Sequence, residues 1–295
     1  MASLRDIRRR IGSIRNIAQI TRAMEMVAAS RMKRAQEAII AARPFAEELD
    51  EVLARVSAAV DYAEEPLLAR RPVRHLALIL VTTDRGLAGA LNSNAVRNAL
   101  RWIAERADAA RDGGEMLRVS AITVGRKGRD ALRRAGIPIA AHFPQFGDRP
   151  TFNDVQPLAR LVTDDFLAET YDEVVISYSA FISTLVQRPA IKSVLPVERP
   201  AIHEGSSIRN DEYLFEPSAE VLSRLLPFYV STDIYRAVLE NIASEQSARM
   251  IAMRNSTDNA HELMDELTLV YNKTRQATIT REMIEIASGA EAQAG

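Results

Sequence analysis

The sequence predicts an α/β fold: long N- and C-terminal helices form an antiparallel coiled coil, joined to a central open, mostly parallel, Rossmann-like domain. Three observations support this prediction. Residues 1–43 contain a single glycine and no proline, and residues 228–288 contain neither, so both ends lack helix breakers. Apolar residues at both ends recur every three or four positions, as on one face of a helix. Between the ends, residues 74–209 alternate short β-rich runs with helical patterns.

The first predicted segment, residues 1–60, is a coiled-coil helix whose apolar stripe runs from Leu4 to Val60. At about 1.5 Å per residue, such a helix would reach roughly 80–90 Å, which exceeds a small domain and requires a partner helix. Pro44 interrupts the stripe. Because the residue before a proline is disfavoured in a helix, we expect a bend or break at Arg43–Pro44.

The last predicted segment, residues 216–288, supplies the partner helix. Glu216-Pro217-Ser218 is typical of a helix start, and Pro227 predicts a kink in the first turns. Two long helices at opposite ends of one chain favour an antiparallel coiled coil. Polar residues interrupt the expected heptad stripe, and either surrounding chains or local looseness would explain them. They are Thr232, Gln246, Arg249 and Ser256.

The central segment, residues 74–209, is predicted to hold five strands and three helices. The expected strands are 75–82, 117–124, 137–143, 172–178 and 191–198, and the expected helices are 88–106, 126–135 and 154–169. Residues 76–81 are all apolar, which suits a central strand that is buried on both faces.

Composition excludes several classes of function. The formal net charge is −1, so there is no global bias toward nucleic acid, and the absence of cysteine excludes disulfides and thiolate metal sites. No stretch of about 18 uncharged apolar residues occurs, so any membrane association would depend on a partner. The four histidines lack metal-ligand spacing, and no G-x-S-x-G elbow is present. We therefore predict no catalytic residue, no metal and no cofactor.

Two loops of the central segment are candidates for nucleotide binding. Residues 82–89 follow the first expected strand, and residues 125–128, Gly-Arg-Lys-Gly, follow the second and could meet a phosphate. Neither the Rossmann glycine signature nor the phosphate-binding loop is present, however. Tight turns that lead into helices are the alternative interpretation.

The N-terminal helix is strongly basic as far as Arg34, with only Asp6 and Glu25 opposing its cations. A solvated helix face would explain this pattern, and so would contact with an acidic protein surface. Nucleic acid fits poorly, because no aromatic side chain for base stacking occurs before Phe45.

Both ends of the chain and one central loop carry motifs that resemble the gamma subunit family of F-type ATP synthases. The similar stretches are residues 14–29, 84–89, 244–260 and 271–282, the last of them reading YNKTRQATITRE. The family often has cysteine where this chain has Ala88, and glutamine where it has Arg281. Because Arg281 stands where the family has glutamine, a polar contact at this position is in doubt.

The resemblance implies a central rotor stalk that carries rotation from a membrane ring of c subunits to a ring of three alpha and three beta subunits. It implies further contact with the epsilon subunit, no nucleic acid, no catalytic site in this chain, and a peripheral location at the cytoplasmic face of the bacterial cell membrane. It also implies which residues contact the alpha/beta ring: Met24, Arg249, Arg275, Gln276, Thr280 and Glu282.

Two other functions remain open from the residues alone. A free α/β enzyme with helical arms would bind a nucleotide or turn over a substrate by itself. A coiled-coil adaptor or chaperone would bind diverse clients rather than one fixed ring.

Overall fold

The computed structural model describes residues 3–59, 65–198 and 219–294. It divides into two compact units, Ala29–Ala248 and Met1–Ala28 with Arg249–Gly295. Helix α1 (Leu4–Ala59) and helix α5 (Ala219–Ala294) each contribute residues to both units. The predicted helix start at residues 216–218 lies outside the described residues.

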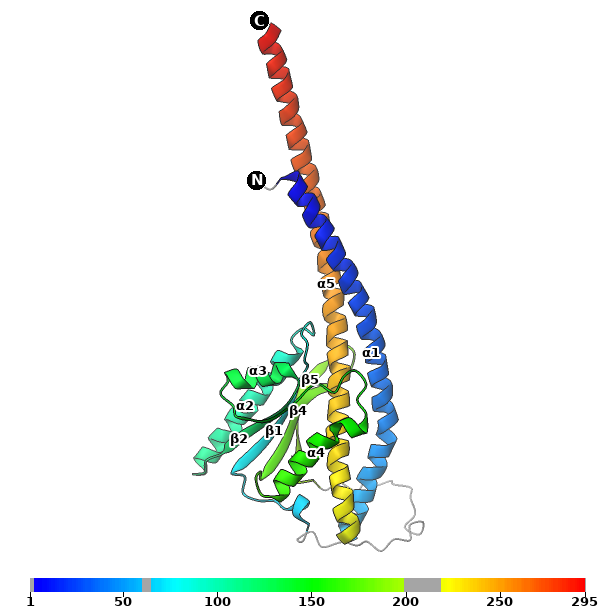
Figure 1. The fold of residues 1–295 in the computed structure, drawn as a ribbon, viewed down its shortest axis with the longest axis vertical. Helices are drawn as coiled ribbons and strands as arrows, with labels where there is room; N and C mark the ends of the chain where they lie inside the picture. Colours follow the sequence, from blue (N-terminus) through cyan, green and yellow to red (C-terminus); the bar gives the residue numbers. More distant parts are fainter. Residues whose placement is uncertain (1–2, 60–64, 199–218, 295) are drawn as a thin grey trace. The chain divides into compact units, whose positions relative to one another are not determined.

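The Ala29–Ala248 unit is built on a five-stranded sheet with the order β3-β2-β1-β4-β5 (Figure 1). The strands are β1 (His75–Val81), β2 (Arg118–Val124), β3 (Ile139–Phe143), β4 (Glu173–Phe181) and β5 (Gln187–Leu195). All neighbours are parallel except β4 and β5, which are antiparallel. The predicted open, mostly parallel sheet is confirmed, and each expected strand is present.

Helices cover both faces of this sheet, with α2 and α3 on one face and α4 and α5 on the other (Figure 1). They are α2 (Leu91–Asp112), α3 (Arg126–Arg134) and α4 (Phe152–Leu167), and a short 3-10 helix, η2, spans Pro66–Leu68. Alternate residues of β1 enter two separate cores. Ala77, Ile79 and Val81 pack with α4 and α5, whereas Leu76, Leu78 and Leu80 pack with α2 and α3.

We expected a bend or a break at Arg43–Pro44, and the break is wrong, because α1 runs through Pro44 without interruption. A proline inside a helix costs about 3 kcal/mol, so packing must offset this loss. Burial of Leu53 (1% exposed) in the core of this unit contributes to the packing. The ring of Phe45 also meets the ring of Phe228 edge-on, with the centroids 5.6 Å apart. Helix α5 likewise continues through Pro227.

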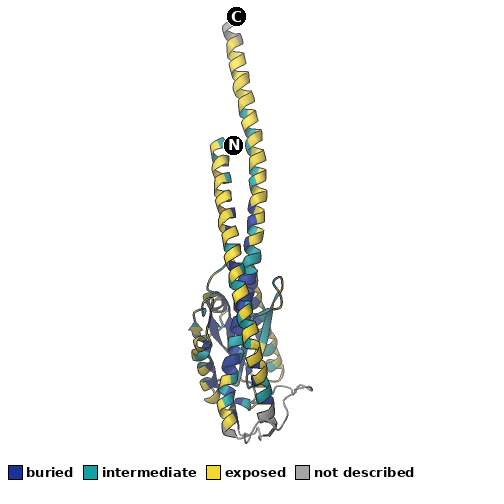
Figure 2. Ribbon diagram, turned by 90° about the vertical axis from the view of Figure 1, so that its right-hand side faces the viewer, coloured by how far each residue is buried: buried dark blue, intermediate teal, exposed yellow. Residues whose placement is uncertain are grey.

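One stretch of α5 is buried on nearly every side. From Ala237 to Ser247, every residue except Glu240 is buried (Figure 2). A helix that is buried all round lies between neighbouring elements rather than along a single partner. Three polar residues of this stretch, Asn241, Ser244 and Ser247, form hydrogen bonds with β4 and the β4–β5 turn.

In the other unit, α1 and α5 run antiparallel. The hydroxyl oxygens of Thr21 and Thr257 lie 2.7 Å apart in a buried contact. The guanidinium of Arg8 lies over the ring of Tyr271, 6.0 Å from its centroid. Because α1 begins at Leu4, the last turns of α5 lie beyond this pairing, and residues 279–290 are all exposed (Figure 2).

Candidate functional site

Strand β4 extends beyond the last residue that pairs with β1, and side chains of α5 form hydrogen bonds with its backbone there. Strand β1 pairs with β4 only as far as Ser177, whereas β4 continues to Phe181. The amide of Ser179 donates to Oδ1 of Asn241 at 3.2 Å, and its carbonyl accepts from Oγ of Ser244 at 2.8 Å. Unpaired buried backbone groups are costly. These two side chains of α5 therefore supply the hydrogen bonds that a neighbouring strand would otherwise make.

The same face of α5 also holds the β4–β5 hairpin. The hydroxyl of Ser247 donates to the carbonyl of Thr184 at 2.5 Å and accepts from Nε2 of Gln187 at 3.2 Å. We call Asn241, Ser244 and Ser247 the polar seam; its successive members are three positions apart and therefore share one face of the helix. The seam fixes both the position and the rotation of α5 on the sheet.

Two carboxylates lie beside the polar seam: Glu245 is buried and Glu240 is half-buried. Glu245, only 3% exposed, accepts a hydrogen bond from Nε2 of Gln145, whose Oε1 accepts from the amide of Asp84. Burial raises the pKa of Glu240. A hydrogen bond from the amide of Phe181 opposes that shift. These contacts connect α5 to two loops of the sheet as well as to β4.

The candidate phosphate loop is occupied by contacts within the chain. The four amides at the start of α3 all donate to protein oxygens: Gly125 to Phe143 O, Arg126 to Asp84 Oδ1, Lys127 to Thr83 O, and Gly128 to Thr82 Oγ1. A phosphate at this helix start would need those same amides. The geometry therefore favours the tight-turn interpretation of residues 125–128.

The residues predicted to contact the alpha/beta ring fall into two groups. Met24 on α1 and Arg249 on α5 are half-buried, and Arg249 interacts with other residues of the chain. Four more lie close together on the exposed C-terminal part of α5: Arg275, Gln276, Thr280 and Glu282. Large apolar side chains lie exposed along the same part of α5, including Ile279, Met283, Ile284 and Ile286.

The basic character of α1 remains largely uncompensated in the unit formed with the end of α5. Asp6 pairs with Arg9 at 3.2 Å, and Glu25 pairs with Arg22 at 2.9 Å. The other arginines of this part of α1 are exposed, namely Arg5, Arg8, Arg10 and Arg15. Arg31, beyond this part of α1, pairs instead with Asp148 at 2.7 Å.

Sequence reasoning did not identify the polar seam. None of its members is among the polar residues that interrupt the expected stripe of α5, but two of those residues are buried in the same unit: Gln246 is 1% exposed and Thr232 is 7% exposed. Surrounding chains were one explanation for such positions. In this unit the chain's own sheet surrounds these positions. The part of β4 that lacks a strand partner could not be inferred from periodicity.

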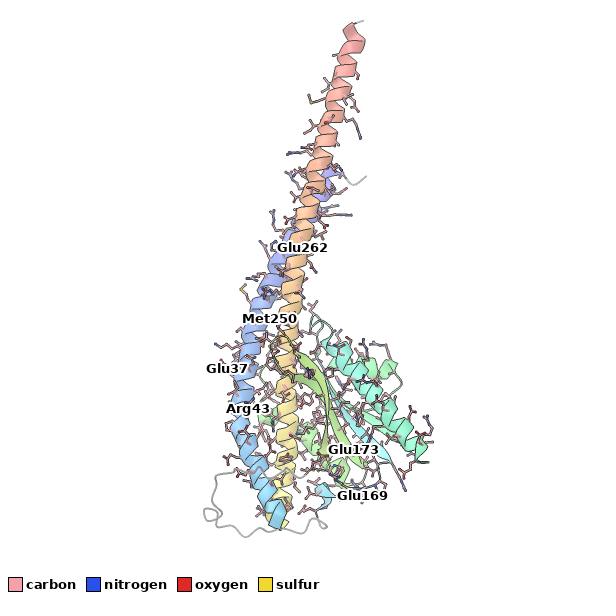
Figure 3. The ribbon with its side chains drawn as sticks, turned by 180° about the vertical axis from the view of Figure 1, so that it is seen from behind. Glu37, Arg43, Glu169, Glu173, Met250 and Glu262 are labelled. Atoms are coloured by element: carbon pink, nitrogen blue, oxygen red, sulfur yellow. The ribbon has the colours of Figure 1, made fainter. Side chains whose placement is uncertain are left out.

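Among the described residues, no helix is long and apolar enough to cross a membrane. Glu173 and Glu169, labelled in Figure 3, form partly buried ion pairs with Arg106 and Arg71.

Comparison with known proteins gives consistent results. A family model described as ATP synthase matches residues 3–293. The chain is 48% identical to the ATP synthase gamma chain of Dehalococcoides mccartyi over the full length of both chains. It is 50% identical to that of Roseiflexus castenholzii, over all of this chain and 99% of the relative.

Solved structures share the fold. The central stalk and c-ring structure of the Tetrahymena thermophila mitochondrial ATP synthase contains a chain that is 25% identical, with a TM-score of 0.58, covering 80% of this chain and 98% of that one. A chain of the Euglena gracilis mitochondrial ATP synthase is 20% identical, with a TM-score of 0.66, covering 98% of this chain and 94% of that one.

Proposed function

The chain belongs to the ATP synthase gamma chain family, and from this premise we propose that it is the central rotor stalk of a bacterial ATP synthase. In this role it carries rotation between a membrane c-ring and a catalytic ring of three alpha and three beta subunits, and it contacts the epsilon subunit. It is a peripheral subunit at the cytoplasmic face of the cell membrane.

The exposed C-terminal part of α5 is the observation that carries this proposal. Ile286 is 73% exposed and Met283 is 66% exposed, on a helix with no α1 residue opposite it. Exposed apolar surface of this kind marks an interaction site. Residues 279–290 are exposed on every side of the helix, and a ring of subunits that closes around it would cover its apolar and polar faces together.

The chain acts through contacts and has no catalytic site of its own. A rotor drives each catalytic subunit by binding its conformations unequally, because a ligand shifts an equilibrium only by its differential affinity. Arg275, Gln276, Thr280 and Glu282 would make these contacts near the end of α5. Met24 and Arg249, together with the basic face of α1, would meet an acidic part of the ring.

The division into segments 1–60, 74–209 and 216–288 follows from this role. The terminal segments form the shaft as an antiparallel coiled coil, and the central segment is the part that holds the shaft to the other rotor subunits. The polar seam then resists slippage of α5 against the sheet while torque passes between them.

Reconstitution with the matching alpha and beta subunits tests the proposal. We expect one copy of this chain per three of each subunit, with ATP turnover that depends on it. Arg275→Glu with Gln276→Glu should reduce the coupling of proton flow to ATP synthesis. Arg160→Glu with Gln156→Glu on α4 applies the same charge change elsewhere and should not. Failure of folded subunits to assemble would refute the rotor function.

A further inference from the structure

A groove of about 670 Å³ lies between α2 and α3, on the face of the sheet opposite α4 and α5. Its lining contains four cationic side chains and no carboxylate. The cations are Arg97 and Arg101 from α2, and Lys127 and Arg134 from α3. Both walls of the groove are therefore positively charged.

The chain itself does little to neutralise this charge. Arg97, Lys127 and Arg134 form no ion pair within 4 Å in the described part of the chain; Arg134 attracts the carboxylate of Asp130 one turn away, but Asp130 pairs with Arg129 at 2.9 Å. Arg101 lies 3.8 Å from Glu105, but both side chains are exposed, at 71% and 66%, and such pairs are weak. The groove thus keeps a local excess of positive charge in a chain whose formal net charge is −1.

The groove also has an apolar strip. Val96 and Leu100, one helical turn apart on α2, pack on the core of this face but are only partly buried, and Ala131 faces them from α3. From Asn92 to Arg101 the groove follows α2 for roughly 13 Å, which matches two to three turns of a helix laid along it.

We propose that this groove binds an acidic amphipathic helix of a partner protein. The apolar face of such a helix would cover Val96 and Leu100, and its carboxylates would meet the cations on both walls. A small anion would leave the apolar strip uncovered, and the amides at the start of α3 are already occupied. Nucleic acid would lack a stacking surface, because none of the residues that line the groove is aromatic.

A peptide tests the groove on the chain alone, so its result does not depend on the rotor function. The probe is a fluorescent helical peptide of about 14 residues, with leucine every three or four positions and glutamate elsewhere. We expect binding that weakens as salt rises, and at least a tenfold loss of affinity in Arg97→Glu with Arg134→Glu. The matched variant, Arg149→Glu with Arg160→Glu, reverses two exposed arginines outside the groove and should bind normally.

Three results with this peptide would overturn the proposal. These are no binding to the unmodified chain, equal losses in the two variants, and complete displacement of the peptide by inorganic phosphate but not by chloride at the same ionic strength, which would indicate an anion site only. A peptide in which every glutamate is replaced by glutamine should bind at least tenfold more weakly. If it binds equally well, the charges of the groove do not select the partner.

Cross-linking identifies the partner in the assembled enzyme. Because the chain has no cysteine, Ser93→Cys places a single thiol at the groove, and Asn153→Cys on α4 places one away from it. With a benzophenone maleimide on the purified complex, we expect Ser93→Cys, but not Asn153→Cys, to capture an acidic helical segment of another subunit. Capture of basic or irregular segments, or no capture at all, would contradict the proposal.

Discussion

Replacing Asn241 by leucine tests whether α5 substitutes for a missing strand. Leucine has a similar volume, so the change removes the acceptor of the Ser179 amide without opening a cavity. Both residues are only 2% exposed, so water cannot replace the lost acceptor. A buried, unpaired amide costs about 1–3 kcal/mol, and about 2 kcal/mol would lower the Tm of a unit of this size by roughly 4–8 °C.

Thermal unfolding followed by circular dichroism measures the loss, and hydrogen exchange locates it. We expect the Ser179 amide to exchange faster in Asn241→Leu than in the unmodified chain. Asn94→Leu, at an exposed position of α2, is the control and should change stability by no more than about 0.5 kcal/mol. If Asn241→Leu leaves both the Tm and the exchange at Ser179 unchanged, α5 does not complete the ladder of β4.

Three further predictions concern other parts of the chain. Burial raises the pKa of Glu240 above 4.5, so Glu240→Gln should raise the Tm at pH 7, and this gain should vanish below pH 4.5, where both proteins are neutral at this position. Gly125→Ala should lower the free energy of unfolding by about 3 kcal/mol or more, because the added Cβ would lie 2.3 Å from a backbone oxygen and the residue has φ +86°. Gly136→Ala is the control: it has φ +75° but lies in open space, so it should cost only about 1 kcal/mol. Urea unfolding measures both. In a double-mutant cycle, Thr21→Val and Thr257→Val should each cost about 1 kcal/mol, and the double variant should cost less than their sum.

Features of the fold that depend on neighbouring residues in the sequence could be predicted, and features that depend on long-range contacts could not. The strand at residues 75–81 was predictable, because a continuous apolar run reports burial on both faces. The continuity of α1 at Pro44 was not, since it depends on long-range packing such as the contact between Phe45 and Phe228. The partners of Asn241 and Ser244 depend on where β1 stops pairing with β4, which is a property of the sheet.

The candidate contacts on α5 were suggested by family resemblance and not by pattern. Periodicity predicts a helix through Arg275 and Gln276, but it cannot distinguish a helix that is exposed to solvent from one that another chain encloses. The structure places them level with the start of α1, just before the part of α5 where Ile279 is 48% exposed and Met283 is 66% exposed. Their role as contacts stays a prediction until the ring is assembled with the variants above.

The contact between Thr21 and Thr257 joins residues 236 positions apart, which has a consequence for how the chain folds. Closing so long a loop from the unfolded state is entropically costly and slow. Once the Ala29–Ala248 unit has formed, Phe45 and Phe228 already hold α1 and α5 together, so the remaining pairs can close over much shorter loops. We therefore expect the sheet to fold before the paired ends, and the ends to separate first on heating.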